Sequence, residues 1–305
     1  MGALPARFRR ERILIIGCGD VGLRAARVLN PRVRVMALTS SPERAPVLRA
    51  QNITPLLGNL DQAHTLQRLA GLATRVLHLA PPPGEGPGDP RTLALMRALR
   101  RRTVPQSLVY GSTTGVYGNC AGDWVAEHRP LQARTARGQR RVAAEHSVRQ
   151  LGHTSQTVVS ILRIPGIYAP DRAGGTPRER LLRGTPVLQP EDDVFTNHIH
   201  ADDLARACVL ALWRGQAQRS YNVNDDSTMK MGDYMDLAAD LYALPRPPRV
   251  TRAQAAEQLS PMLFSFMSES RRMVNTRMKR ALRLVLRYPT VASGLQGKWL
   301  SRVDV

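Results

Sequence analysis

The fold of this chain is decided by residues 12–22, which read RILIIGCGDVG. The four apolar residues 13–16 predict a short buried strand, and residues 23–29 continue as a helical pattern. Between them stand three glycines with the spacing G-x-G-x-x-G, and a second strand pattern follows at 33–38. Strand, glycine turn, helix and strand in this order predict a loop that binds a dinucleotide. A tight strand-to-helix turn without a ligand is the alternative.

Each glycine of this loop has a physical role. Gly17 lets the chain turn sharply, Gly19 lets the backbone approach a diphosphate, and Gly22 lets the helix pack closely on the strand. The helix directs its unpaired N–H groups and the positive end of its dipole toward that diphosphate. The predicted cofactor contacts in the loop are therefore Gly17, Gly19, Asp20, Val21 and Gly22.

The composition is typical of a soluble globular protein. The chain has 305 residues, of which 43% are hydrophobic, enough for one large α/β domain or a domain with a smaller companion. No apolar run approaches the roughly 20 residues that cross a bilayer, and the stretch 13–17 that follows the basic residues 1–12 is too short for an export signal. The 3 cysteines are odd in number and far apart, which fits a reducing compartment. We therefore predict a cytoplasmic protein without a membrane partner, and without a metal because no zinc-site spacing occurs.

Arginine carries nearly all of the formal net charge of +20. Lysine occurs only at positions 230, 279 and 298, so we interpret the charge as a compositional habit of the source genome. Aromatic residues make up 5% of the chain, too few for a platform that stacks bases. No helix-turn-helix or finger pattern is present. We therefore expect no nucleic-acid partner, and only a general attraction to anionic cofactors or phosphorylated substrates.

Strand and helix patterns alternate through the first half of the chain. This order predicts a doubly wound parallel α/β sheet, a Rossmann fold, with right-handed crossovers. Such a sheet binds ligands at the carboxyl ends of its strands, where the strand order reverses. The predicted strands are 13–16, 33–38, 53–57, 76–80, 107–110 and 157–164, and the predicted helices after the first are one beginning at 41, then 61–69, 92–101 and 135–151.

The second half is less regular and predicts a smaller, mostly helical portion that covers the site. We divide the chain into a dinucleotide-binding core, 1–164, and a substrate or lid portion, 165–305, with 195–225 returning to the core. The elements expected after 164 are a loop-rich segment with a short helix at 178–183, an extended segment at 195–200, a strand at 220–223, and helices at 202–213, 231–241, 252–259 and 271–282.

The end of the second strand indicates which nicotinamide cofactor is bound. A carboxylate there would accept hydrogen bonds from the ribose 2′-hydroxyl of NAD, but Thr39, Ser40 and Ser41 occupy this place and Arg44 follows. Hydroxyls and a guanidinium suit a 2′-phosphate, so NADP is the predicted cofactor and NAD the second choice. An ordinary helix N-cap with a solvated arginine is the alternative. Ala80, at the end of the fourth predicted strand, is a further expected contact.

Several motifs follow the glycine loop in a recognisable order: STTGVYG at 112–118, LRIPGIYAP at 162–170, NHIHADDLA at 197–205, YNV at 221–223 and RYP at 287–289. With them the chain resembles the extended and atypical short-chain dehydrogenase/reductases, the NAD(P)-dependent epimerase/dehydratase group of nucleoside-diphosphate-sugar enzymes. The resemblance covers nearly the whole chain. It implies a Rossmann core with a small C-terminal substrate domain, a homodimer, and reversible hydride transfer on a nucleotide sugar or similar small polar molecule.

The resemblance also implies individual site residues. The family's catalytic hydroxyl, three residues before the valine of V-Y-G, is Thr113 here, and the family's adenine-contacting aspartate is replaced by Asn59. The family's proton donor is a tyrosine with a lysine four residues later on the same helix face. These positions hold Arg137 and Arg141 in this chain. Arginine stays protonated, so neither residue can serve as a general acid or base.

Three alternatives are open at this departure. Tyr117 or Tyr168 supplies the proton, although each can equally be a packed aromatic residue. His198 or His200 supplies it, or positions the loops beside the substrate, which we favour. The arginine pair holds a phosphate or carboxylate, or forms a solvated basic face.

The sequence thus predicts an NAD(P)-dependent oxidoreductase or epimerase/dehydratase-like enzyme. A catalytically silent sensor of NADP(H) is the alternative, because the tyrosine–lysine pair is replaced. The catalytic candidates are Thr113 and Tyr117, and the substrate-contact candidates are Tyr168, His198 and His200.

Overall fold

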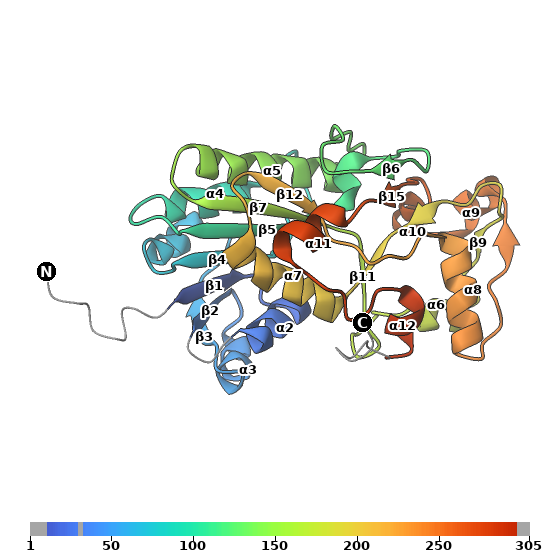
Figure 1. Ribbon diagram of the computed structural model, residues 1–305, viewed down its shortest axis with the longest axis horizontal. Coiled ribbons are helices and arrows are strands. Elements are labelled where there is room, and N and C mark those ends of the chain that lie inside the picture. The colour runs from blue at the N-terminus through green and yellow to red at the C-terminus, as the bar shows by residue number, and fades with distance from the viewer. Residues whose placement is uncertain (1–10, 30–32, 298–305) are drawn as a thin grey trace, which may run out of the picture.

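The computed structural model describes residues 11–29 and 33–297, and a parallel β-sheet forms its centre (Figure 1). Within those residues the sheet has 7 strands, and every neighbouring pair is parallel. The strand order changes direction between β1 (Arg12–Ile16) and β4 (Arg75–His78), where sheets of this type bind ligands. The predicted Rossmann fold is confirmed. Across the sheet the strands are β3 (Thr54–Leu57), β2 (Arg34–Thr39), β1 (Arg12–Ile16), β4 (Arg75–His78), β5 (Ser107–Thr113), β7 (Val158–Ile164) and β12 (Arg219–Asn222).

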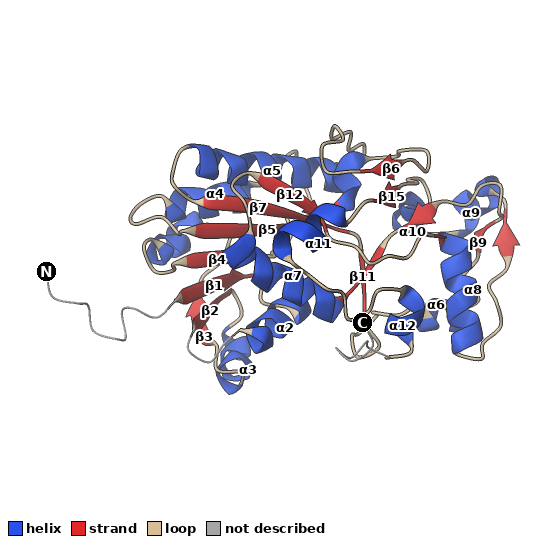
Figure 2. Cartoon of the chain, viewed as in Figure 1, coloured by secondary structure: helices blue, strands red, loops and turns tan. Residues whose placement is uncertain are grey.

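Successive side chains of β1 enter two separate hydrophobic cores. Ile13 and Ile15 belong to one core, and Leu14 and Ile16 belong to the other, all of them fully buried. A strand covered on both faces needs an unbroken apolar run, which this segment provides. The first core includes side chains of α2 (Asp20–Val28), α3 (Ala45–Ala50), α7 (Ala201–Arg214) and α11 (Thr276–Leu282), and the second includes η2 (Ala63–Leu69), α4 (Pro90–Leu99) and α5 (Ala136–His153). Figure 2 shows these helices around the sheet.

The elements after β7 form a second, smaller body beside the carboxyl ends of the sheet (Figure 1). Its short strands pair as β8 with β11, β9 with β14 and β10 with β13. The chain also returns to the large sheet here, because β12 pairs with β7 and α7 packs on α2. The elements are β8 (Gly166–Tyr168), α6 (Arg178–Leu182), β9 (Val187–Leu188), β10 (Phe195–Thr196), β11 (His198–His200), β13 (Met229–Lys230), α8 (Met231–Leu241), β14 (Arg249–Val250), α9 (Arg252–Gln258), α10 (Pro261–Phe266) and α12 (Val291–Leu295).

Some predicted helices take other forms. The segment predicted as a helix at 61–69 forms the 3₁₀ helix η2. At its start the Thr65 hydroxyl donates to the carbonyl of Gln62 (2.7 Å), and this hydrogen bond competes with α-helical bonding. The helix predicted from 41 begins as the 3₁₀ turn η1 (Pro42–Arg44) before α3. The helix predicted at 271–282 starts later, because β15 (Arg272–Met273) pairs with the distant β6 (Trp124–Val125).

The division of the chain at 164 and 165 stays a prediction. The prediction that the chain has no export signal rests partly on residues 1–10, which lie outside the described residues. Residues 298–305 of the substrate portion also lie outside them. Among the helices that the structure describes, none is both long and apolar enough to span a bilayer.

Candidate functional site

The glycine loop after β1 has the geometry that its sequence pattern predicts. Gly17 adopts φ +82°, and a Cβ atom there would lie 2.4 Å from the backbone nitrogen of Ala80, so no other residue fits. A Cβ at Gly22 would press against the carbonyl oxygen of Gly17 at 3.2 Å. At Gly19, by contrast, a Cβ would meet nothing within 4 Å. The loop is therefore closed on the protein side and open on the side where a ligand approaches.

Helix α2 begins directly at this opening. Gly19 is its N-cap residue, and no side chain caps the first turn, so the N–H groups of that turn remain available to a ligand. Val21 packs against the first core and Asp20 lies in the first helical turn. A bare helix N-terminus above an open glycine loop fits a dinucleotide diphosphate.

The other predicted cofactor contacts lie at the carboxyl ends of the neighbouring strands β2, β3 and β4. The Thr39 hydroxyl accepts a hydrogen bond from the backbone N–H of Ser41 (3.2 Å), and Ser40 is exposed. Arg44 reaches across from β2 to the glycine loop, where its Nη2 donates to the carbonyl of Cys18 (2.8 Å). The structure thus brings the loop and the predicted 2′-phosphate residues together.

Asn59 and Ala80 complete this edge of the sheet. The Asn59 side-chain oxygen accepts from the backbone N–H of Asp61 (3.0 Å) in a turn just after β3. Ala80 donates its N–H to the carbonyl of Ile16 (3.1 Å) and packs directly against Gly17. Whether these residues contact a cofactor stays a prediction, but Ala80 lies directly beside the glycine loop.

Arg24 ties the cofactor loop to the rest of the molecule, and the sequence analysis did not find it. The side chain is buried and contacts Asp20 (3.0 Å), Asp171 (2.7 Å) and Asp202 (2.5 Å). Arg172 adds a contact to Asp20 at 3.3 Å. The Arg24 guanidinium lowers the pKa of Asp171. The spacing of four residues between Asp20 and Arg24 was the available signal, although it does not reveal the distant partners.

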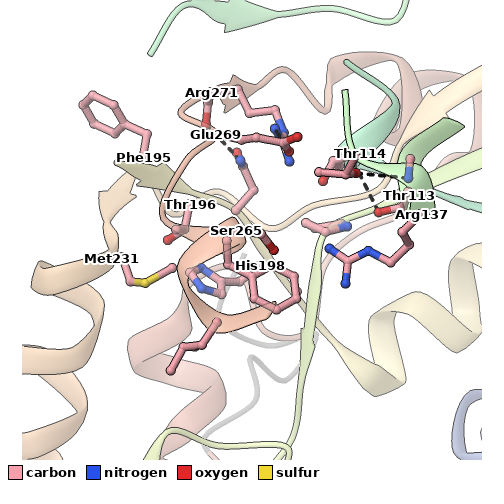
Figure 3. Close-up of a pocket in the computed structure, with 18 of the residues that line it drawn as sticks. Thr113, Thr114, Arg137, Phe195, Thr196, His198, Met231, Ser265, Glu269 and Arg271 are labelled. Atoms are coloured by element: carbon pink, nitrogen blue, oxygen red, sulfur yellow. Dashed lines mark hydrogen bonds and ion pairs between the residues drawn. The ribbon is translucent and has the colours of Figure 1, made fainter. Parts of the chain in front are cut away.

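A cavity of about 390 Å³ opens between the carboxyl end of β5 and the second body. Figure 3 shows Arg137 reaching into it from the side of Thr113, with Phe195, Thr196 and Met231 on the opposite side. The lining residues are Thr113, Thr114, Gly115, Thr135, Arg137, Gly138, Arg141, Pro165, Gly166, Arg180, Phe195, Thr196, Asn197, His198, Met231, Leu263, Ser265, Phe266, Glu269 and Arg271.

Thr113 and His198 are the predicted catalytic and substrate residues that line this cavity. The Thr113 hydroxyl accepts from the backbone N–H of Gly115 (3.3 Å) at the start of η3 (Thr114–Tyr117). The His198 ring packs against Tyr234 with 4.2 Å between ring centroids. Burial lowers the pKa of His198 to about 4, so the imidazole is neutral near pH 7.

Tyr117 is buried beside the cavity and does not line it. Its hydroxyl donates to the side-chain oxygen of Asn222 (2.8 Å) and accepts from Nη1 of Arg163 (2.8 Å). Burial raises the pKa of the phenol to about 12. Arg163 in turn pairs with the buried Glu145 (2.9 Å). The phenol therefore belongs to a buried network beneath the site.

Tyr168 and His200 also lie outside the cavity lining. The Tyr168 hydroxyl lies 3.3 Å from the Asp225 carboxylate and donates to the carbonyl of Thr290 (3.2 Å). His200 caps α7, where its Nδ1 accepts the N–H of Asp202 (3.2 Å). Both side chains fix the loops around the cavity from behind.

Arg137 and Arg141, which the sequence analysis assigned to the tyrosine and lysine positions, both line the cavity. Nη1 of Arg141 donates to the carbonyl of Gly111 (2.7 Å) and to the Tyr110 hydroxyl (3.1 Å). The Arg137 guanidinium lies over the Phe266 ring, 4.6 Å from its centroid. The structure thus places two permanent positive charges beside Thr113.

Four residues that line the same cavity also carry buried polar atoms without a hydrogen-bond partner. They are Nε and Nη2 of Arg180, Oγ1 of Thr196, Nδ1 of His198 and Nε of Arg271. Burial lowers the pKa of Arg180. Buried polar groups almost always have partners in folded proteins, so these four residues stand out among those that line the cavity. Sequence analysis missed Arg180, Thr196 and Arg271, since no local pattern tells which arginines turn inward.

Comparisons with known proteins agree with this geometry. Residues 13–224 match the model of the NAD dependent epimerase/dehydratase family. A functionally unknown conserved protein from Silicibacter pomeroyi DSS is 30% identical, with a TM-score of 0.78 over 94% of this chain and 98% of its own. No curated protein matches the chain.

Two further solved structures share the fold. A nucleoside-diphosphate-sugar epimerase from Pseudomonas aeruginosa is 16% identical, with a TM-score of 0.76 over 94% of this chain and 95% of its own. UDP-glucuronic acid 4-epimerase from Bacillus cereus, solved with UDP-glucuronic acid and NAD, is also 16% identical, with a TM-score of 0.73 over 94% and 97%.

Proposed function

We propose, on the premise that this chain belongs to the NAD dependent epimerase/dehydratase family, that it is an NAD(P)-dependent oxidoreductase or epimerase/dehydratase-like enzyme. Its substrate is a nucleotide sugar or a similar small polar molecule. The observation that carries the proposal is the polar lining of the cavity beside Thr113, to which Arg180, Thr196, His198 and Arg271 all contribute. A purely structural cavity has no need of such a lining.

The residues of the chain take distinct roles in this proposal. The glycine loop and the N-terminus of α2 hold the cofactor diphosphate, and a bound nicotinamide supplies a reversible acceptor of hydride. Thr113 hydrogen-bonds the reacting oxygen of the substrate, and His198 contacts the substrate. Tyr117, Tyr168 and His200 support the site from behind.

The proposed cofactor is NADP rather than NAD. The hydroxyls of Thr39 and Ser40 and the guanidinium of Arg44 border the end of β2, and Arg44 already reaches the glycine loop. A guanidinium pairs with a 2′-phosphate, whereas NAD leaves it without a partner. Calorimetric titration should therefore give a lower Kd for NADPH than for NADH. A lower Kd for NADH would contradict the assignment.

The enzyme proposal is tested by following NADPH or NADP absorbance with a panel of sugar nucleotides, aldehydes and ketones. Turnover of at least one compound is the expected result. A catalytically silent NADP(H) sensor is the second candidate. It is supported by Arg137 and Arg141, which both line the cavity and which we assign to the positions of the tyrosine–lysine pair. Tight cofactor binding without turnover of any compound would favour the sensor.

We also propose that the protein is cytoplasmic and forms a homodimer. Residues 165–305 are the proposed substrate portion of each chain. The three cysteines are free and buried, which suits a reducing compartment. Arg180, Thr196 and Arg271 reach the cavity from the second body, as a substrate portion should. Sedimentation velocity on the full chain tests the dimer, and a single monomeric species at micromolar concentration would contradict it.

A further inference from the structure

The cavity carries more positive charge than its own acidic residues neutralise. Arg137, Arg141, Arg180 and Arg271 line it, whereas Glu269 is the one carboxylate in the lining and pairs with Arg271 at 2.8 Å. Within the described residues, no carboxylate forms an ion pair with Arg137 or Arg141. Charges in a partly enclosed cavity are poorly screened, so the remaining positive charge favours an anionic occupant.

The guanidinium of Arg137 has donors to spare. Its Cζ lies over the Phe266 ring, 4.6 Å from the ring centroid. Among the described residues no acceptor takes a hydrogen bond from this exposed side chain, so its forked N–H groups are available to a ligand. Figure 3 shows the side chain extending into the cavity from the same side as Thr113.

Arg141 stands one helical turn further along α5 and is fixed by its neighbours. Its Nη1 donates to the Gly111 carbonyl and the Tyr110 hydroxyl, which leaves the charge uncompensated. The first turn of α5 also borders the cavity through Thr135 and Gly138, so the positive end of this 18-residue helix adds to the same potential. His198, which is more than nine-tenths buried, lines the same cavity.

We propose that the reacting end of the substrate carries a carboxylate, which Arg137 and Arg141 bind beside Thr113. This inference rests on the proposed function and names its substrate class more closely. A carboxylate is planar and offers two oxygens, which match the forked donors of a guanidinium. A neutral hydroxymethyl group offers one oxygen and no charge. Arg137 and Arg141 therefore suit an acidic sugar better than a neutral one.

Two commercially available probes isolate this carboxylate. UDP-glucuronic acid and UDP-glucose differ in a carboxylate against a hydroxymethyl group on the sugar, and share every other group. Both are titrated into the full chain saturated with NADPH. We expect UDP-glucuronic acid to bind about tenfold more tightly, as suits a charge-assisted bidentate contact.

Arg137→Gln should bring the ratio of the two dissociation constants close to one. Arg140→Gln is the matched control, because Arg140 is a nearby arginine of α5 and its Nη1 donates to the Gly86 carbonyl (3.3 Å) away from the cavity. The control removes the same charge and should keep the preference. Circular dichroism confirms that both variants are folded.

The outcomes separate this inference from the proposed function. Equal affinities for the two probes, or a preference that Arg137→Gln leaves intact, overturn the carboxylate assignment while nucleotide-sugar binding stands. If NADPH is retained but neither probe binds, the nucleotide-sugar substrate is wrong, and the carboxylate assignment is overturned with it. If Arg140→Gln lost the preference for UDP-glucuronic acid to the same extent, the preference would come from the overall charge of the protein. That result would also overturn the carboxylate assignment.

Discussion

At the scale of single residues, Gly17 has the tightest surroundings in the cofactor loop. Its φ is +82°, and an added methyl group would lie 2.4 Å from the backbone nitrogen of Ala80. Both features exclude a side chain at this position. We therefore expect Gly17→Ala to abolish NADPH binding, with a loss of at least about 100-fold, because the loop must move to admit the methyl group. Fluorescence titration of NADPH measures the effect.

Gly86→Ala is the control for that substitution. Gly86 has a similar φ of +86°, but a Cβ there would meet nothing within 4 Å. It should share the modest backbone penalty of an alanine at positive φ, about 1 kcal/mol in stability, and keep the Kd for NADPH. Equal losses of NADPH affinity in both variants would show that strain alone, rather than the contact with Ala80, disturbs the loop.

The buried carboxyl group of Asp225 makes the stability of the fold depend on pH. Burial raises its pKa to about 8, whereas an aspartate in an unfolded chain titrates near 3.9. The folded state therefore holds this proton more tightly than the unfolded chain does. The stabilisation that results is complete below about pH 4 and is lost as the pH rises through about 8. Each pH unit in that window removes up to about 1.4 kcal/mol.

Asp225→Asn should remove this dependence, because an amide resembles the protonated carboxyl group and can still bond Ser227 and Tyr168. The free energy of unfolding is measured in urea at pH 5 and at pH 8.5. From the lower to the higher pH it should fall by a few kcal/mol more in the native chain than in the variant. The same loss in both proteins would place the titrating group elsewhere.

At the scale of elements, Arg24 joins α2 to α7 and to the loop after β8. Replacing it by methionine leaves Asp20, Asp171 and Asp202 close together without their shared cation. We expect Arg24→Met to cost about 2–3 kcal/mol in the free energy of unfolding, below the usual figure for a buried pair because the Asp171 side chain is 67% exposed. Arg27→Met, on the exposed side of the same helix, should change it by less than about 0.5 kcal/mol. Similar losses in the two variants would contradict this assignment.

At the scale of the whole molecule, cofactor binding should stabilise the core against heat. At a concentration of 100 times Kd, a ligand of the folded state adds about 2.7 kcal/mol, which corresponds to a rise in Tm of roughly 4 °C for a chain of this size. Calorimetry with NADPH measures this shift. An unchanged Tm at millimolar NADPH would exclude the proposed cofactor.

The sheet and the cofactor loop were predictable from sequence because their signals are local. Residues 12–22 carry strand, turn and helix start in one continuous stretch, and the alternating cores of β1 follow from that run. The substrate side depends on contacts between distant segments. Nothing in the local sequence distinguishes Tyr117, which turns into a buried network, from His198, which faces the cavity, or shows that Arg180 and Arg271 meet there.

The burial of the thiols has a practical consequence for labelling experiments. Cys18, Cys120 and Cys208 are all buried, and burial raises the pKa of Cys18 to about 11 and that of Cys208 to about 12. Maleimide dyes attack the thiolate, so the native chain should stay almost unlabelled at neutral pH. In a Gln139→Cys variant the new thiol, at an exposed position of α5, would then be the main site that the dye labels. The fluorophore would lie next to the helix face from which Arg137 enters the cavity.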